Sequence, residues 1–254
     1  MNKRLIFCLL FKDNHFQLSR NFTLQSVGDI KWIKNNFSFD ETCKSIDEIM
    51  FIHAKNNPSQ DEKKTFLKTV NNLRKKLFIP IGIGGGIRTI DDVRSYFEVG
   101  ADKIILNTSF YDKKLLIDLS NKYGAQSISA MIDYKNEKGK RTIYTNSSTK
   151  KFNFFDEYKL LNFQKDNIGD LIFNSIDRDG TGQGLDLGIS KKVKKTSNPI
   201  ILMGGAGKSD HIIKSLKLNN INGVATSNIF NFLGKGLSSA REKLFQMKIK
   251  VAKF

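Results

Sequence analysis

Cysteine is scarce in this sequence of 254 residues. Only Cys8 and Cys43 are present, and they form neither the paired spacing of a zinc site nor the framework of a disulfide-stabilised domain. The three histidines, His15, His53 and His211, lie in no metal-binding pattern with neighbouring carboxylates. We therefore expect no metal ion and no other cofactor.

Long apolar runs are also absent. The run nearest the N-terminus, Leu5 to Phe11, has seven residues, whereas a membrane-spanning helix needs about 20. It follows a basic start, as in a signal peptide, but Lys12-Asp13-Asn14-His15 stands where a small-residue cleavage site would be. The sequence thus predicts a cytoplasmic protein with no membrane partner.

Acidic residues are few relative to basic ones. The chain has 25 Asp and Glu against 42 Lys and Arg, a formal net charge of +17. Such a field attracts phosphorylated metabolites, nucleotides, acidic proteins or nucleic acid. The chain has no signature of a nucleic-acid-binding module, and the surplus is mostly lysine scattered along predicted helices. A solvated surface is the simpler interpretation, and we expect no nucleic-acid partner.

The stretch from Pro80 to Asp112 carries the clearest pattern. An apolar run ends at Gly84-Gly85-Gly86, a helix-forming segment follows, and a second apolar run, Lys103 to Leu106, ends at Asn107-Thr108-Ser109. A strand, helix and strand of this length make two parallel strands. The glycines expose backbone N–H groups at a helix N-terminus, which suits a phosphate. A tight turn that binds nothing is the alternative.

This pattern repeats 120 residues later. Gly204-Gly205-Ala206-Gly207 matches the glycine turn, and Asn220–Phe230 matches Gly100–Phe110 at the same offset. Two half-barrels of four β/α units would produce such a repeat, and the length is close to the roughly 250 residues of one (β/α)8 barrel. We therefore predict an α/β fold, a TIM barrel made of two half-barrels, in a single domain over residues 1–254.

The remaining elements complete this barrel. Residues 12–28 are expected to form a long loop, and residues 134–155 a polar excursion with a hairpin through Lys140–Tyr144. Helices are expected near residues 29–46, 61–78, 113–123, within 155–168, near 209–218 and in the 230s and 240s. The other strands are predicted at Leu5–Phe11, Ile49–Ile52, Ser127–Asp133, Leu171–Phe173, Pro199–Met203 and Gly223–Thr226.

The repeat predicts two phosphate sites, one in each half, which suits a long substrate with a phosphate at each end. A duplicated fold with inactive sites is the alternative. The residues expected to bind phosphate are the turn and strand-end positions Gly85, Gly86, Thr108, Gly180, Thr181, Gly204, Gly205, Ala206, Ser227 and Asn228.

Three motifs together resemble one family across essentially the whole chain. They are Ile83–Thr108, Ser175–Thr181 (SIDRDGT) and Gly204–Lys208 (GGAGK). The sequence is similar to the cyclase subunit of imidazole glycerol phosphate synthase, a (β/α)8 barrel of histidine biosynthesis known as HisF. The resemblance implies a glutaminase partner, HisH-like, at the N-terminal face of the barrel. It also implies that ammonia from that partner passes along the barrel axis to a phosphorylated substrate.

Four charged residues stand at the beginnings of predicted barrel strands: Arg4, Glu48, Lys103 and Asp170. Catalytic groups of a TIM barrel lie at the opposite face. The resemblance implies that these four form a ring that gates the ammonia channel. A salt-bridge plug that seals the barrel is the alternative. Either interpretation requires the charges to pair with one another, because unpaired buried charges are costly.

The family uses two aspartates, at the ends of strands one and five, as acid and base. Asp133 matches the second position, but Leu10 stands at the first, and leucine cannot transfer a proton. Asp179 is retained and could serve as the second acid or base. The basic residue that the family has in its first loop aligns with Leu18, and His53 stands where an aspartate is expected at the end of strand two.

Leu10 resembles a divergent branch of the family that works with a glutaminase and a third enzyme in surface polysaccharide biosynthesis, on an acetamidino sugar. Three hypotheses follow. The first is an ammonia-dependent synthase or lyase subunit that aminates or amidinates a phosphorylated or nucleotide-linked sugar, with Asp133 as acid or base. The second is a histidine-pathway cyclase that has moved its second acid/base role to Asp179 or His53. The third is a non-catalytic scaffold that binds a phosphorylated ligand and regulates the glutaminase.

Overall fold

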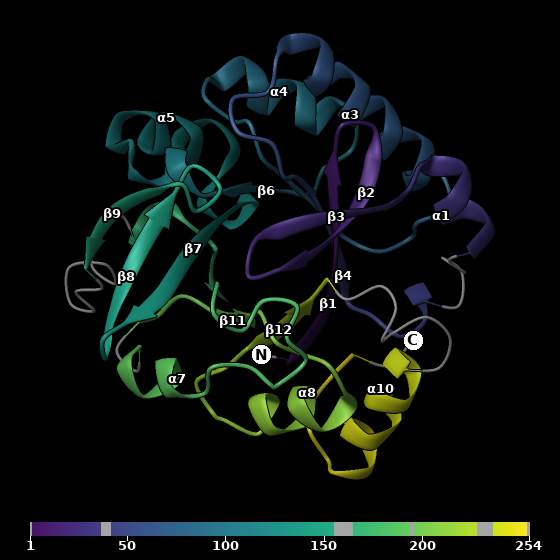
Figure 1. The fold of residues 1–254 in the computed structure, drawn as a ribbon, viewed down its shortest axis with the longest axis vertical. Helices are drawn as coiled ribbons and strands as arrows, with labels where there is room; N and C mark the ends of the chain where they lie inside the picture. Colours follow the sequence, from purple (N-terminus) through teal and green to yellow (C-terminus); the bar gives the residue numbers. More distant parts are fainter. Residues whose placement is uncertain (1, 37–41, 155–164, 194–195, 228–235, 253–254) are drawn as a thin grey trace.

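Eight parallel strands close into a barrel (Figure 1). The structure is a computed structural model and describes residues 2–36, 42–154, 165–193, 196–227 and 236–252. Each barrel strand pairs in parallel with the next, and the last pairs with the first, which confirms the predicted TIM barrel. The barrel strands are β1 (Arg4–Lys12), β4 (Glu48–His53), β5 (Ile81–Gly84), β6 (Lys103–Leu106), β7 (Ile128–Glu137), β10 (Asp170–Ser175), β11 (Ile200–Met203) and β12 (Gly223–Thr226).

Helices surround the barrel on its outer side (Figure 1). The helix predicted within residues 155–168 lies largely outside the described residues, which show there only a 3-10 turn, η3 (Lys165–Asn167). The described helices are α1 (Ile30–Asn36), α3 (Gln60–Arg74), α4 (Ile90–Glu98), α5 (Lys113–Tyr123), α7 (Gly188–Lys192), α8 (Ser209–Leu216) and α10 (Gly236–Gln246), with 3-10 turns η1 (Thr108–Tyr111) and η2 (Ala125–Ser127).

Strand β1 divides its side chains between two apolar layers. Leu5, Phe7 and Leu9 pack into the large layer beneath the helices. Ile6, Cys8 and Leu10 belong to a separate cluster inside the barrel. This division follows from the two-residue period of a strand, and because both faces are covered, β1 reads in sequence as an unbroken apolar run.

Residues 12–28 form an antiparallel hairpin, so the prediction of a long loop was wrong. Strand β2 (His15–Arg20) pairs with the end of β1, and β3 (Thr23–Gly28) pairs with β2. The turn between them is Asn21-Phe22, with both residues in the left-handed region at φ 50° and 64°. The usual sequence signal for such a turn is Asn-Gly or Asp-Gly; phenylalanine at the second position concealed it.

The second excursion confirms the predicted hairpin and enlarges it. Strand β7 continues beyond Asp133 and pairs with β8 (Lys140–Thr145), which in turn pairs with β9 (Lys150–Phe154). Lys138 and Gly139 make the tight turn, with φ of 50° and 81°. Both hairpins continue from the carboxyl ends of barrel strands, β2–β3 from β1 and β8–β9 from β7. In Figure 1 the β2–β3 hairpin crosses in front of the barrel, while β8 and β9 lie at its edge.

The two halves of the barrel correspond closely, with one adjustment to the predicted offset. Strand β12 begins and ends 120 residues after β6. The left-handed glycine pairs, however, are Gly85-Gly86 and Gly204-Gly205, which are 119 residues apart. A Cβ on Gly85 would lie 2.2 Å from the carbonyl oxygen of His53, and one on Gly204 would lie 2.6 Å from that of Ser175. Each turn therefore needs glycine, because it lies against the end of the preceding strand.

Candidate active site at the carboxyl ends of the strands

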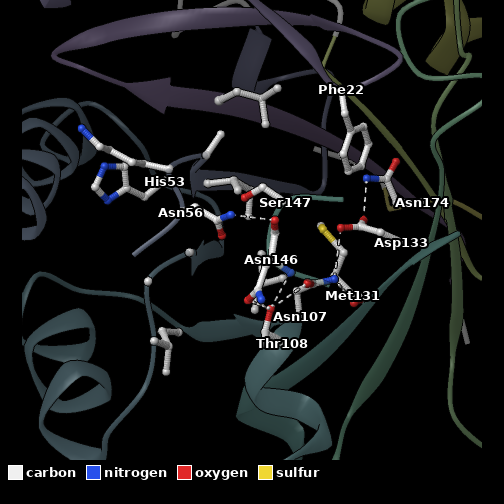
Figure 2. A pocket seen from close by; sticks show the side chains of 18 of the residues that line it. Phe22, His53, Asn56, Asn107, Thr108, Met131, Asp133, Asn146, Ser147 and Asn174 are labelled. Atoms are coloured by element: carbon white, nitrogen blue, oxygen red, sulfur yellow. Dashed lines mark hydrogen bonds between the residues drawn. The ribbon is translucent and has the colours of Figure 1, made fainter. Parts of the chain in front are cut away.

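A pocket opens over the carboxyl ends of the barrel strands, the face where TIM barrels carry their active sites. We call it the central pocket. Figure 2 shows its interior, with Asp133 and Asn174 beside Phe22, and Thr108 with Asn146 further along. It is lined by Leu10, Ser19, Phe22, Leu24, Ile52, His53, Ala54, Lys55, Asn56, Asn57, Gly85, Gly86, Ile87, Arg88, Ile105, Leu106, Asn107, Thr108, Ser109, Met131, Asp133, Asn146, Ser147, Asn174, Asp179 and Met203.

Asp133 lies at the base of the central pocket and is 5% exposed. Its two carboxylate oxygens accept hydrogen bonds from Asn174 Nδ2 at 3.0 Å and Asn107 Nδ2 at 3.1 Å. Burial raises the pKa of Asp133 to about 7, against the lowering effect of the Asn174 amide and with a further contribution from the charge of Asp179. A carboxyl group with this pKa can give or take a proton near neutral pH.

Leu10 occupies the apolar wall of the same pocket. It is paired in register with Ile52 of β4 and is 9% exposed. Leu24, Ile52 and Ala54 pack against the cluster that contains it. The described structure therefore places no carboxylate where the family's first aspartate would stand, and this side of the pocket suits an apolar part of a ligand.

Asp179 is 3% exposed and is held by the β2–β3 hairpin. Its Oδ2 accepts hydrogen bonds from Ser19 Oγ at 2.5 Å and from the Phe22 backbone N–H at 3.1 Å. Burial raises the pKa of Asp179, while these two donors act to lower it. The sequence predicts an acid or base here, but the geometry also makes Asp179 an anchor for the hairpin.

The first predicted phosphate site belongs to the central pocket, where Gly85, Gly86 and Thr108 all line the wall. The Thr108 hydroxyl lies 3.3 Å from Asn146 Oδ1 and accepts a hydrogen bond from the Asn146 N–H at 3.0 Å. Arg88 Nη2 donates to the side-chain oxygen of Asn57 at 3.2 Å. The glycine turn thus faces the tip of the β8–β9 hairpin across a space lined by polar side chains.

The second predicted phosphate site forms another cavity, which we call the side pocket. It is lined by Leu18, Ser19, Arg20, Asn21, Thr23, Gln25, Asp179, Gly180, Gly182, Gly204, Gly205, Ala206, Ala225, Thr226 and Ser227. Five of the predicted residues are among them. Thr181 is not, and its hydroxyl donates to the carbonyl of Arg178 at 2.8 Å. Asn228 lies outside the described residues.

His53 faces away from Asp133 (Figure 2). Its ring stacks on Phe66 of α3 with centroids 4.9 Å apart, in the layer between barrel and helices. Burial lowers the pKa of His53 to about 4, so the ring is neutral near pH 7. Its backbone closes the pocket wall, while its imidazole packs as a core side chain, which disfavours the acid/base role weighed for it.

The four charges at the opposite face form a closed set of ion pairs. Arg4 contacts Glu48 at 3.1 Å and Asp170 at 2.5 Å, and Lys103 contacts Asp170 at 2.7 Å and Glu48 at 3.4 Å. Burial raises the pKa of Glu48. Burial also acts to raise the pKa of Asp170, but the hydrogen bonds and charges of Arg4 and Lys103 outweigh it and hold that pKa below its usual value. We call this set the charged ring.

The space between the charged ring and the central pocket is filled by uncharged side chains. Next along β1 from Arg4 come Ile6, Cys8 and Leu10, and the other strands contribute the rest of one buried cluster: Met50, Ile105, Met131, Ile172, Ile201, Met203 and Ala225. An ion would be costly there, whereas a neutral molecule would lose less on leaving water.

Several residues of the site were not predicted from the sequence. Phe22 and Ser19 reach Asp179 only because residues 15–28 fold as a hairpin. Asn174 ends a barrel strand directly before the SIDRDGT motif, a position that could have marked it as pocket-lining. Asn107 ends β6 in the same way. Neither Asn107 nor Asn174 was among the residues predicted for the site.

Among the described residues, no three Cys, His, Asp or Glu side chains gather as a metal site requires. None of the described helices has both the length and the apolar character needed to cross a membrane.

Comparison with known proteins matches residues 43–235 to the family of the histidine biosynthesis protein. A protein of Parasynechococcus marenigrum (strain WH8102), provisionally named imidazole glycerol phosphate synthase subunit hisF2, is 39% identical, over 95% of this chain and 90% of the relative. The imidazole glycerol phosphate synthase subunits HisF of Hydrogenobaculum sp. (strain Y04AAS1) and Sulfurisphaera tokodaii are 31% and 33% identical. They cover 91% and 85% of this chain, and 90% and 86% of their own lengths. The chain therefore belongs to the HisF family of histidine biosynthesis proteins.

Proposed function

We propose that this chain is the ammonia-using synthase subunit of a glutamine amidotransferase pair. A HisH-like glutaminase docks at the N-terminal face and releases ammonia beneath the charged ring. The ammonia crosses the uncharged interior and reacts with a phosphorylated or nucleotide-linked sugar above Asp133. One observation carries the proposal: the charged ring is complete, while with Leu10 at the end of β1 the central pocket keeps Asp133 as its one described carboxylate that the β2–β3 hairpin does not hold.

The ring suits a gate because its charges are balanced and partly exposed. Its two cations and two anions satisfy one another, and the side chains of Arg4 and Lys103 keep 18% and 20% of their surface accessible. Movement of one cation would open a path without leaving an unpaired charge in the interior. Above it, the uncharged cluster favours neutral ammonia over ammonium.

The proton transfers that the central pocket can support are limited by its carboxylates. Asp133 has a pKa of about 7 and can serve as base in one step and acid in the next. Leu10 cannot share that task. A sugar amination or amidination, in which one group handles both protons, is therefore favoured over a cyclisation that needs two groups on opposite sides.

The test is reconstitution with the glutaminase encoded nearest to the gene. We expect a one-to-one complex in which glutamine hydrolysis is faster than in the glutaminase alone. Mass spectrometry of ligand retained on that complex would identify the substrate class. A chain that neither binds nor stimulates the glutaminase would contradict the proposal. Unchanged product formation by Asp133→Asn in the assembled system would favour a scaffold role instead.

A second candidate is the histidine-pathway cyclase reaction, because two compared relatives named subunit HisF are 31% and 33% identical. In this chain Asp179 would have to supply the second acid/base group, although Ser19 and Phe22 occupy its Oδ2. Complementation of a strain without the cyclase tests this directly. Growth without histidine would favour the cyclase, and no growth despite good expression would count against it.

A further inference from the structure

We propose that the tip of the β8–β9 hairpin is a lid that holds the central pocket shut by occupying it with a side chain of the protein itself. The side-chain oxygen of Asn146 takes the position that an oxygen of the substrate's phosphate would take. The inference rests on the proposed function, because it assumes that a phosphorylated substrate enters the central pocket. It goes beyond that function by assigning an autoinhibitory contact, which the substrate must displace.

Two donors of the central pocket converge on the side-chain oxygen of Asn146. Arg88 Nη2 lies 3.4 Å from Asn146 Oδ1, and Thr108 Oγ1 lies 3.3 Å from the same atom. Arg88 follows the Gly85-Gly86 turn in the chain, and all of these residues line the pocket. A carboxamide oxygen is a neutral hydrogen-bond acceptor, so it imitates one oxygen of a phosphate without its charge.

These two contacts are weak enough for an anion to replace them. Hydrogen bonds in proteins are most often about 2.9 Å long for an N–H donor and about 2.8 Å for an O–H donor, and both contacts to Asn146 Oδ1 are longer. A phosphate oxygen would also pair its charge with the Arg88 guanidinium through shorter hydrogen bonds. The donors therefore favour phosphate over the carboxamide of the lid.

The backbone of Asn146 ties the lid to the loops on either side of the glycine turn. Its N–H donates to Thr108 Oγ1 at 3.0 Å, and its carbonyl accepts from Asn56 Nδ2 at 2.9 Å. Figure 2 shows Asn56, Asn146 and Thr108 next to one another. Asn56 follows β4 and Thr108 follows β6, the two neighbours of β5 in the barrel. One hairpin residue thus bridges the space above the turn that ends β5.

The stem of the hairpin is well anchored, whereas its tip has an unfavourable backbone. In the stem, Glu137 accepts hydrogen bonds from Tyr144 at 2.7 Å and from Lys151 at 2.8 Å. At the tip, residues 146–148 are all left-handed, at φ 53°, 53° and 61°, a region that is unfavourable for residues with a Cβ. The contacts of Asn146 hold this conformation, so their loss lets the tip relax while the stem stays in place.

The lid predicts an opposite sign for hydrogen exchange from that of an ordinary binding site. A ligand that leaves the chain in place slows amide exchange around it. Phosphate should instead accelerate exchange of the Asn146 amide, because displacement of the tip takes this N–H away from Thr108 Oγ1. We expect roughly a threefold acceleration or more in the full-length protein at saturating inorganic phosphate, measured by 15N NMR. The amides of β8, in the stem, should exchange at unchanged rates.

Two variants separate the side chain of Asn146 from the flexibility of the tip. Asn146→Gly removes the competing oxygen, so inorganic phosphate should bind about fivefold more tightly, the effect of about one hydrogen bond. The amide shifts of Gly85 and Gly86 report this affinity. Ser148→Gly is the matched control, because it loosens the same left-handed tip at a residue that is not among those described as lining the central pocket. Its affinity should stay within about twofold of the wild type.

Four results would overturn the lid and leave the proposed function standing. They are unchanged phosphate affinity in Asn146→Gly, weaker affinity in that variant, an equal gain in Ser148→Gly, and slower exchange of the Asn146 amide in the presence of phosphate. Weaker affinity would make Asn146 a ligand of the phosphate. If Gly85 and Gly86 respond to phosphate in neither the wild type nor Asn146→Gly, the phosphorylated substrate of the proposed function is contradicted as well.

Discussion

Asn174 donates a hydrogen bond from Nδ2 to Oδ1 of Asp133 over 3.0 Å, and the two residues are register partners on adjacent barrel strands. The amide favours the ionised carboxylate, whereas burial favours the protonated form, and burial has the larger effect. The pair thus sets the proton affinity of Asp133, which, unlike Asp179, is not held by the β2–β3 hairpin.

We expect the Asp133 carboxyl group to titrate near pH 7 instead of near 4. The measurement is the 13C shift of aspartate carboxyl carbons as a function of pH, with Asp133→Asn identifying the signal by its loss. Asn174→Ala removes a donor to the ionised form and should raise the pKa further. A midpoint near 4 in the wild type would contradict the burial argument.

The raised pKa of Asp133 also makes the free energy of unfolding depend on pH. A carboxyl group whose pKa is raised in the folded state stabilises the protein below its unfolded pKa, and this contribution is lost as pH rises through the folded pKa. For Asp133 the stabilisation is lost between about pH 4 and about pH 7. The loss in the free energy of unfolding is up to about 4 kcal/mol, since each unit of pKa difference corresponds to about 1.36 kcal/mol.

Urea denaturation at pH 4 and pH 8 checks this expectation. The free energy of unfolding of Asp133→Asn relative to the wild type should increase between the two pH values. The comparison cancels other titrating groups, because both proteins share them. A difference that does not change with pH would show that folding does not raise the pKa of Asp133.

Gly180→Ala and Gly182→Ala form a matched pair. Both glycines are left-handed, at φ 67° and 66°, so alanine costs each roughly 1 kcal/mol in backbone conformation. Only at Gly180 would the new Cβ meet the Ser19 carbonyl oxygen, at 1.9 Å; at Gly182 its nearest neighbour is the Gly207 Cα at 3.7 Å. We expect Gly180→Ala to displace the β2–β3 hairpin and Gly182→Ala to leave it in place.

Hydrogen exchange at the Asn21 amide reports that displacement, because this N–H donates to the Asp179 carbonyl. Exchange should accelerate at least tenfold in Gly180→Ala, equivalent to about 1.4 kcal/mol of local stability. Equal exchange rates in the two variants would mean that the hairpin tolerates the contact.

In the charged ring, Asp170→Asn leaves Arg4 and Lys103 facing the single carboxylate of Glu48. We expect a loss of about 2–3 kcal/mol in the free energy of unfolding, somewhat less than for a fully buried pair because both cations are partly exposed. Lys64→Met is the control: its ion pair with Asp61 is exposed, so its loss should cost less than about 1 kcal/mol.

Acid should weaken the ring in the same way as Asp170→Asn. The pKa of Asp170 is lowered on folding, so its contribution is present above the unfolded pKa and is lost as pH falls through the folded one. The stability difference between wild type and Asp170→Asn should therefore shrink towards low pH. A difference that stays constant from pH 7 to pH 3 would contradict the assignment of charge to Asp170.

The sequence by itself determined the barrel, the repeat and the two glycine turns. These features depend on local pattern: short apolar runs, helical periodicity and glycine at strand ends specify their elements without reference to distant residues. The charged ring was also predictable, because its members are the charged residues at four strand starts, and closure of the barrel brings strand starts together.

Only the tertiary structure decided which side chains share a pocket. Three features depend on contacts between segments far apart in the chain. They are the Asn21-Phe22 turn, the hydrogen bond from Ser19 to Asp179 and the outward stacking of His53 on Phe66. These contacts cannot be predicted from a pattern of residue types, since each depends on which face of a strand its neighbours already occupy. Leu18 and Arg20 line the same cavity because the hairpin places both residues there.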